Sequence, residues 1–256
     1  MIIQSIGPGA RELECEKILK ERFEWREGTS DIDRVIILPL PSTRDGVTVC
    51  GTDTALMTVA DGVRRGTLVV GYGIPDTVTE RILAVGAAVC DAARDERFTE
   101  DNARLTAWAA LGYMLLDAGI APEDLSVGIV GWGRIGSQLG AQLAFLGARL
   151  TVYTTAKDKR IELGRLGIRT ADTLSEADFR GIDVLINTAP ARAIPADAPG
   201  VSEILKIYDL ASGSFTDHID GVIKLPSLPT RYYTKSAAKR YAEYVVRMLD
   251  GRYARI

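Results

Sequence analysis

A short apolar segment that runs into three spaced glycines constrains the fold of this chain more than any other feature. Residues 126–130 read as a buried strand, and Gly131-Trp132-Gly133-Arg134-Ile135-Gly136 follows directly. In such a turn the first glycine permits the tight bend, the second lets a pyrophosphate approach the backbone, and the third lets the next helix pack closely. An amphipathic stretch follows, and Gly147 ends it before a second strand at 150–153. The pattern predicts a dinucleotide-binding β–α–β unit with these six residues at the phosphates; a glycine turn kept only for packing is the alternative.

The end of the second predicted strand bears on the choice between NAD and NADP. An acid about 20 residues past the glycines usually accepts hydrogen bonds from the ribose 2′-hydroxyl of NAD. The strand is instead followed by Thr154-Thr155-Ala156-Lys157-Asp158-Lys159-Arg160, with two hydroxyls and then three cations in four positions. This composition favours the 2′-phosphate of NADP, and we assign Thr154, Thr155 and Lys157 to the cofactor site. The alternative is that the three cations form the solvated first turn of the next helix.

Composition excludes several other classes of protein. With 256 residues, 46% of them apolar and 25% charged, the chain is long enough for one or two globular domains. The net charge of −3 argues against nucleic-acid binding, which needs a basic surface. One histidine and three separated cysteines form no zinc-ligand spacing, so we expect no metal. No apolar stretch reaches 18 residues and no leader pattern opens the chain, so we expect no membrane association and a cytoplasmic location.

Strand-like and helix-like segments alternate along the chain, which predicts parallel sheets. In the first hundred residues the predicted strands are 2–6, 34–38, 67–71 and 85–90, and the predicted helices are 10–21 and one that starts at 77. A long helix is expected over 102–119, with Thr99 or Asp101 as its cap. Strands are expected at 182–187, 207–210 and 221–225, and a last helix at 235–250.

These elements predict an α/β protein with two parallel-sheet βα domains and an interdomain cleft, the second domain being a Rossmann-type dinucleotide-binding domain. The expected divisions are a flavodoxin- or Rossmann-like substrate domain over 1–100, a linking helix over 101–120, the NAD(P)-binding domain over 121–233 and a C-terminal helix over 234–256.

The motifs together resemble the dehydrogenase component of the bacterial dipicolinate synthase family. The resemblance spans nearly the whole chain. The segments that carry it are Gly7-Pro8-Gly9-Ala10-Arg11, Ile37-Leu38-Pro39 with the loop after it, Asn102-Ala103 with Thr106, the glycine turn, Asp183 to Pro190, Tyr208 to Ser212, and Leu225 to Pro229. The family implies a sporulation-related dehydrogenase that oxidises a dihydro- or hydroxytetrahydrodipicolinate with NADP, and its partner is a flavoprotein, the second component. We also expect a homo-oligomer.

The resemblance also implies roles for residues at predicted strand ends. By the family's arrangement Asn187, Thr188, Ala189 and Pro190 lie along the ribose and the nicotinamide, and Asp209, Ala211 and Ser212 lie beside the carboxamide. For a dicarboxylate substrate, Ser42 and Thr43 offer hydroxyls and Arg44 offers a bidentate guanidinium, while Asn102 and Thr106 lie one turn apart on the linking helix. The alternatives are an ordinary strand exit at Asn187, a capping acid at Asp209, a solvated Arg44 and a helix cap at Asn102.

Two other functions stay open. The family tends to have Thr-x-Glu-Gly where this chain has Thr106-Ala107-Trp108-Ala109, so one alternative is a non-catalytic NADP-binding regulatory or scaffold protein. The other is a D-2-hydroxyacid-type dehydrogenase, whose catalytic histidine works with an arginine and a carboxylate. His218 has no matching motif, and we expect it to be solvated or locally bonded. We expect Trp108 in the core or over the cleft, and we assign no catalytic residue.

Overall fold

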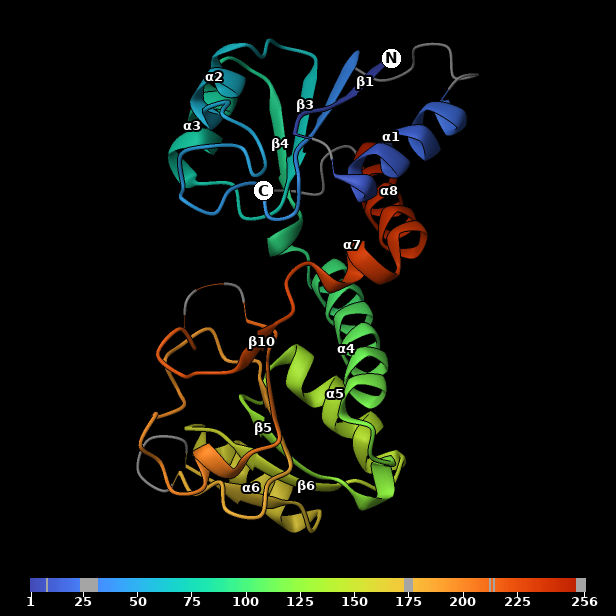
Figure 1. Cartoon of the computed structure of the whole chain (residues 1–256). Coiled ribbons are helices and arrows are strands. Elements are labelled where there is room, and N and C mark those ends of the chain that lie inside the picture. The colour runs from blue at the N-terminus through green and yellow to red at the C-terminus, as the bar shows by residue number, and fades with distance from the viewer. Residues whose placement is uncertain (8, 24–31, 173–176, 212, 214, 252–256) are drawn as a thin grey trace. The chain divides into compact units, whose positions relative to one another are not determined.

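A computed structural model describes residues 1–7, 9–23, 32–172, 177–211, 213 and 215–251. The chain divides into two compact units, one made of Met1–Asn102 with Pro229–Ile256 and the other of Ala103–Leu228. Each unit contains a parallel sheet with helices packed on it, which confirms the predicted α/β class (Figure 1). The expected cleft stays a prediction.

The first unit has a four-stranded parallel sheet whose spatial order follows the sequence: β1 (Ile2–Ser5), β2 (Arg34–Ile37), β3 (Thr67–Gly71) and β4 (Ala88–Asp91). Successive side chains of a strand point to opposite faces. Val35 and Ile37 accordingly belong to the core cluster with helices α1 (Ala10–Phe23) and α8 (Thr234–Asp250). Ile36 and Leu38 belong to the cluster with α2 (Leu56–Asp61) and α3 (Asp76–Ala84) on the other face (Figure 1). Both faces are therefore buried, as is usual for a parallel sheet.

The second unit has a six-stranded parallel sheet in the order β10-β9-β8-β5-β6-β7. The strands are β5 (Ser126–Val130), β6 (Arg149–Tyr153), β7 (Arg169–Ala171), β8 (Val184–Asn187), β9 (Lys206–Asp209) and β10 (Val222–Lys224). The chain moves outward from β5 to β7, returns to place β8 beside β5, and then continues to β10. This is the doubly wound order of dinucleotide-binding domains, with its topological switch point between β5 and β8.

Helices of the second unit bury apolar side chains against this sheet. Helix α5 (Arg134–Phe145) contributes Leu139 and Leu143 to a core that includes Val127 and Ile129 of β5. The part of helix α4 (Glu96–Ala118) that belongs to this unit adds Met114 to the same core. Helix α6 (Lys157–Arg165) follows β6.

Several element boundaries differ from the sequence-based expectations. Helix α4 begins at Glu96, because the Asp95 carboxylate accepts a hydrogen bond from the Phe98 N–H at 2.7 Å and so caps the helix. The predicted caps Thr99 and Asp101 are therefore wrong, since both lie inside the helix. Strand β4 begins at Ala88 rather than at 85, because Gly86 adopts φ +73° in the turn after α3. Helix α2 and strand β7 were not predicted, and helix α6 was foreseen only in the alternative interpretation of the cations at 157–160.

The C-terminal helix is part of the first unit. Helix α8 follows the short helix α7 (Leu228–Tyr232) and packs against α1. The Tyr241 hydroxyl donates a hydrogen bond to the Leu38 carbonyl just after β2, at 3.1 Å. One face of the amino-terminal sheet is thus covered by a helix from the far end of the sequence. Among the described helices, none is both long and apolar enough to cross a membrane.

Candidate functional site

The glycine turn after β5 has three glycines in three different environments. Gly131 adopts φ +90°, and a Cβ there would lie 3.0 Å from both the Thr188 Oγ1 and the Ala189 N atom. A Cβ at Gly136 would overlap the Gly131 carbonyl oxygen. At Gly133, by contrast, a Cβ would meet no described atom within 4 Å. The first and third glycines are therefore needed for packing, whereas the second faces open space, as the approach of a pyrophosphate requires.

The first turn of α5 continues this open space. Gly133 is the N-cap of α5, and among the described residues no side chain forms a cap hydrogen bond there; the first turn also contains no acid. The amino end of a helix carries unpaired N–H groups and a partial positive charge. The turn and the helix end together fit the pyrophosphate of a dinucleotide, which Gly133 and the first turn of α5 would hold.

Three residues of this turn have distinct surroundings. Trp132 is half-buried, and its indole lies over Gly140 of α5, where a Cβ would overlap the ring. Ile135 is half-buried against the same core, and Arg134 is exposed. The Trp132 side chain thus packs on the domain, and the assignment of these residues to the cofactor stays a prediction.

A buried polar cluster lies at the carboxyl ends of β8 and β9, formed by Asn187, Asp209 and Thr216, with exposed fractions of 1%, 2% and 2%. The Asn187 side-chain amide donates to Asp209 Oδ1 at 2.9 Å, across neighbouring positions of the two strands. The same Oδ1 accepts from the Ala211 N–H at 3.0 Å, and the Thr216 hydroxyl donates to Oδ2. Every polar atom of the Asp209 carboxylate is thus satisfied inside the domain.

This Asn187–Asp209–Thr216 cluster fixes the loop that borders the glycine turn. The Asn187 Oδ1 atom accepts from the Ala189 N–H at 3.2 Å, and the Thr188 hydroxyl lies 3.1 Å from the carbonyl oxygens of Val130 and Gly131. The Asn187 and Asp209 side chains are both buried, and their hydrogen bonds lead to this loop. Contact of these two residues with the cofactor stays a prediction. Thr188 and Ala189 lie beside the turn. The side chains of Thr188, Ala189, Pro190 and Ala211 are all at least partly accessible, and Ser212 lies outside the described residues.

The cations after β6 are divided between ion pairs and solvent. Arg160 donates from Nη1 to the Thr154 carbonyl at 2.5 Å and pairs with Asp172 at 2.9 Å. Lys159 pairs with Glu162 at 2.9 Å. Lys157 is exposed and, within the described part of the chain, has no ion-pair partner. The alternative interpretation of these cations is correct in one respect, since α6 begins at Lys157.

The two predicted hydroxyls at this position differ in exposure. Thr154 is buried and its Oγ1 accepts from the Ala156 N–H at 3.3 Å, which shapes the turn into α6. Thr155 is exposed. Of the residues predicted to bind the ribose end of the cofactor, Thr155 and Lys157 thus present side chains to solvent, and Thr154 does not.

The three predicted substrate residues after β2 have different surroundings. Ser42 is fully buried, and its Oγ accepts a hydrogen bond from the Tyr72 N–H at 2.8 Å. Its contact with a substrate stays a prediction. The Thr43 hydroxyl donates to Asp45 at 2.9 Å. Hydrogen bonds from the Thr48 hydroxyl and from backbone N–H groups hold the pKa of the Asp45 carboxyl well below its usual range. Arg44 is exposed and has no ion-pair partner among the described residues, as the solvated alternative predicts.

The predicted pair on the linking helix is separated by the boundary between the compact units. Asn102 is the last residue of its segment of the first unit and Thr106 belongs to the second. Asn102 lies inside α4 and is half-buried, which rules out the helix-cap alternative, whereas Thr106 is buried. Their role at a substrate stays a prediction.

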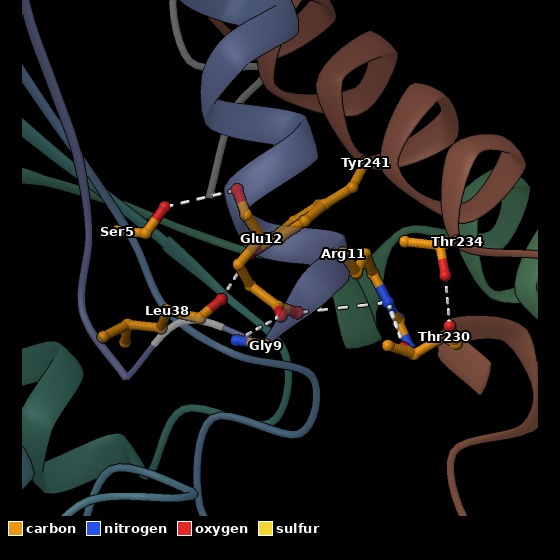
Figure 2. Close-up of polar contacts among 8 residues, drawn as sticks. All are labelled: Ser5, Gly9, Arg11, Glu12, Leu38, Thr230, Thr234 and Tyr241. Carbon is orange, nitrogen blue, oxygen red and sulfur yellow. Dashed lines mark hydrogen bonds and ion pairs between the residues drawn. The ribbon is translucent and has the colours of Figure 1, made fainter.

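The first unit contains a buried charged pair that the sequence alone does not connect with a function. Arg11 and Glu12, in the first turn of α1, are each only 3% exposed (Figure 2). The Arg11 Nε and Nη2 atoms donate to the Thr230 hydroxyl, with 2.8 Å for Nε, and Glu12 Oε1 lies 3.9 Å from Arg11 Nε. Glu12 Oε2 also accepts from the Gly9 N–H at 3.1 Å.

This pair joins segments that are far apart in the sequence. Burial lowers the pKa of Arg11 and raises that of the fully buried Tyr241 well above its ordinary value. Figure 2 shows Arg11 directed toward Thr230 and Glu12 directed toward Gly9 in the loop after β1. An arginine and a glutamate shortly after the Gly7-Pro8-Gly9 segment were visible in the sequence, but their burial was not, because it depends on packing against helix α8 and Thr230.

Two further side chains resolve alternatives left by the sequence. His218 Nε2 lies 2.7 Å from the Ile194 carbonyl oxygen, so His218 is locally bonded, as expected. Trp108 is 41% exposed, with the Arg104 guanidinium 5.8 Å from its ring centroid, so its expected place in the core is wrong.

Comparisons with known proteins bear on the fold. No protein-family model matches the sequence, and no curated protein matches it. One component of dipicolinate synthase from Bacillus halodurans is similar in structure, with a TM-score of 0.72 and 18% identity over 97% of each chain. Dipicolinate synthase from Bacillus subtilis gives a TM-score of 0.67 and 18% identity over 98% of this chain and 96% of that one. D-lactate dehydrogenase from Lactobacillus jensenii, solved with NAD+, gives a TM-score of 0.51 and 16% identity over 99% of this chain and 97% of that one.

The chain has the fold of the dinucleotide-dependent dehydrogenases. At these identities the likeness is one of fold, and the chemistry has to be argued from the site itself. The second unit places an open glycine turn, a helix amino end and a hydrogen-bonded loop together at the carboxyl edge of its sheet, which is where such folds bind ligands.

Proposed function

We propose that this protein is an NADP-dependent oxidoreductase that transfers hydride to or from a cyclic dicarboxylate of the dihydro- or hydroxytetrahydrodipicolinate type. The observation that carries the proposal is the glycine turn at the switch point of the second unit, where a Cβ fits at Gly133 but not at Gly136. The similarity in fold to two dipicolinate synthase structures supports the choice of substrate class.

In this proposal the bound nucleotide supplies the hydride chemistry, and the residues of the chain bind and orient the reactants. The backbone around Gly133 and the first turn of α5 hold the pyrophosphate, and Thr155 and Lys157 lie toward the 2′-phosphate. The loop of Thr188 to Pro190 borders the ribose and nicotinamide. Thr43, Arg44, Asn102 and Thr106 are the proposed contacts for the substrate carboxylates. A flavoprotein partner and a homo-oligomeric assembly belong to the same proposal.

The first experiment is a fluorescence titration of the purified protein with NADPH and with NADH. NADP and dihydrodipicolinate are then added together while absorbance at 340 nm is followed. We expect tighter binding of NADPH and a rise in absorbance that depends on substrate.

A matched pair of glycine variants separates nucleotide binding from folding. Gly133→Ala adds a methyl group to open space at φ −85°, so it should leave the melting temperature nearly unchanged while blocking the approach of the pyrophosphate. Gly164→Ala in α6 also adds a methyl group that meets no described atom within 4 Å, and it should leave nucleotide affinity unchanged. Equal affinity of wild type and Gly133→Ala would contradict the assignment of the turn.

A non-catalytic NADP-binding protein is the second candidate, because Trp108 occupies the position where the resembling family has a glutamate. Trp108 is exposed rather than part of the core. Binding of NADPH with no absorbance change, at any concentration of dihydrodipicolinate and with the flavoprotein partner supplied, would favour this function over the first.

A further inference from the structure

The two ion pairs after β6 differ in a way that bears on coenzyme choice. The Lys159–Glu162 pair lies on the surface of α6, with side chains 50% and 61% exposed. The Arg160–Asp172 pair is much less accessible, at 22% and 18%. Exposed pairs are weak and rearrange readily, whereas a partly buried guanidinium with two acceptors is held in place.

Arg160 lies near the end of the second strand of the unit, where a dinucleotide-binding domain recognises the 2′ group of the ribose. Its Nη1 atom bonds the carbonyl oxygen of Thr154, the first residue after β6, and Asp172 directly follows β7, which pairs with β6. This end of the second strand is where an acid binds the 2′-hydroxyl of NAD or an arginine binds the 2′-phosphate of NADP. Here both an arginine and an acid are present, and they bind each other.

We infer that Asp172 sets the coenzyme specificity of this protein by competing with the 2′-phosphate of NADP for the Arg160 guanidinium. The inference rests on the proposed function, since it requires that a dinucleotide binds at the glycine turn. Arg160 binds a carboxylate oxygen 2.9 Å away, and a phosphate offers the same guanidinium more charge and three oxygens. NADPH therefore binds by displacing Asp172 from Arg160, whereas NADH, which has no 2′-phosphate, leaves the ion pair intact.

The competition predicts opposite effects for the two partners. Asp172→Asn removes the competing charge and should increase the affinity for NADPH about fivefold, the size expected for a partly exposed ion pair. The affinity for NADH should not change. Arg160→Gln should lower the affinity for NADPH by at least that factor and should also leave the affinity for NADH unchanged. In the double variant, Asp172→Asn should give no gain, because its effect acts through Arg160.

A charge-matched control separates this pairing from a general change in charge. Glu162→Gln removes one negative charge from α6, the helix that contains Arg160, but Glu162 pairs with Lys159 and not with Arg160. It should therefore shift the NADPH affinity much less than Asp172→Asn does. Thermal melting of each variant checks that it is folded, and Arg160→Gln tests the competition from the other side if Asp172→Asn does not fold.

The experiment is a fluorescence titration of wild type, the two single variants, the double variant and Glu162→Gln with NADPH and NADH. Failure of wild type to bind either nucleotide would overturn the proposed function. Wild-type binding with the same ratio of NADPH to NADH affinity in Asp172→Asn as in Glu162→Gln would overturn the inference alone. So would a full gain from Asp172→Asn in the absence of Arg160.

Discussion

Replacement of Asp209 gives a prediction whose size follows from the geometry of the Asn187–Asp209–Thr216 cluster. Asp209→Ala leaves the Ala211 N–H without its acceptor and removes the acceptor that orders the Asn187 amide and the Thr216 hydroxyl. A buried donor left without a partner costs about 1–3 kcal/mol, and a cavity adds to this. We expect Asp209→Ala to lower the free energy of unfolding by about 3–5 kcal/mol.

Asp209→Asn is the matched control for this prediction. The two neighbours that donate from nitrogen, Asn187 and Ala211, share Oδ1, and the Thr216 hydroxyl donates to Oδ2. An amide whose oxygen takes the Oδ1 position keeps both bonds, and the Thr216 hydroxyl can turn to accept from the new NH2 group. The loss should therefore be only about 1 kcal/mol.

Thermal and urea denaturation measure both losses, with nucleotide titration as a second readout. A loss of about 3 kcal/mol corresponds to roughly 10 °C in melting temperature for a protein of this size. Asp209→Ala should also weaken nucleotide binding where it is still folded, because the loop at Ala189 is no longer fixed through Asn187. A melting temperature within about 2 °C of wild type for Asp209→Ala would refute the reasoning, as would equal losses for the two variants.

Three more predictions concern other parts of the chain. Gly136→Ala should unfold or strongly destabilise the second unit, because its Cβ would overlap the Gly131 carbonyl oxygen. A melting temperature of Gly136→Ala that is no lower than that of Gly133→Ala would contradict this. Arg11→Met should cost about 3 kcal/mol because it leaves the buried Glu12 carboxylate without its cation, and Arg11→Met with Glu12→Leu should recover part of the loss in urea denaturation. Hydrogen bonds to the ionised Asp45 carboxylate lower its pKa in the folded state. They therefore stabilise the fold at pH values above the unfolded-state pKa, and this contribution is lost as the pH falls through the pKa of the folded state. Asp45→Asn should thus lower the melting temperature at pH 7 and match wild type more closely toward about pH 2; a gap that widens on acidification would be the opposite sign.

Local patterns in the sequence were sufficient to predict the fold class and the glycine turn. The run from residue 126 to Gly136 carries an apolar strand, three glycines and a helix start within one short segment. Strand β3 matches its prediction at 67–71, since turn residues bound it on both sides. Such features depend on side-chain periodicity and backbone freedom within about ten residues, so neighbours in sequence decide them.

The candidate site was predictable only where backbone conformation defines it. Gly131, Gly133 and Gly136 have the environments that their spacing predicts. Ser42, Asn187 and Asp209 are predicted ligand contacts because they lie at strand ends, and the structure adds that the side chain of each is buried and hydrogen-bonded within its own domain. Position at the carboxyl end of a strand does not determine whether a polar side chain faces a ligand or a neighbouring loop.

The sequence by itself determined two parallel sheets, the glycine turn and the helix that follows it, because these depend on short-range pattern. Only the tertiary structure decided which charges are paired and which are exposed. Arg160 meets Asp172 because β7 lies beside β6, Asn187 meets Asp209 because β9 lies beside β8, and Arg11 meets Thr230 across 219 positions of the chain. Burial and pairing depend on which strands and helices become neighbours, and the order of strands in a sheet is set by packing of the whole domain rather than by any single segment.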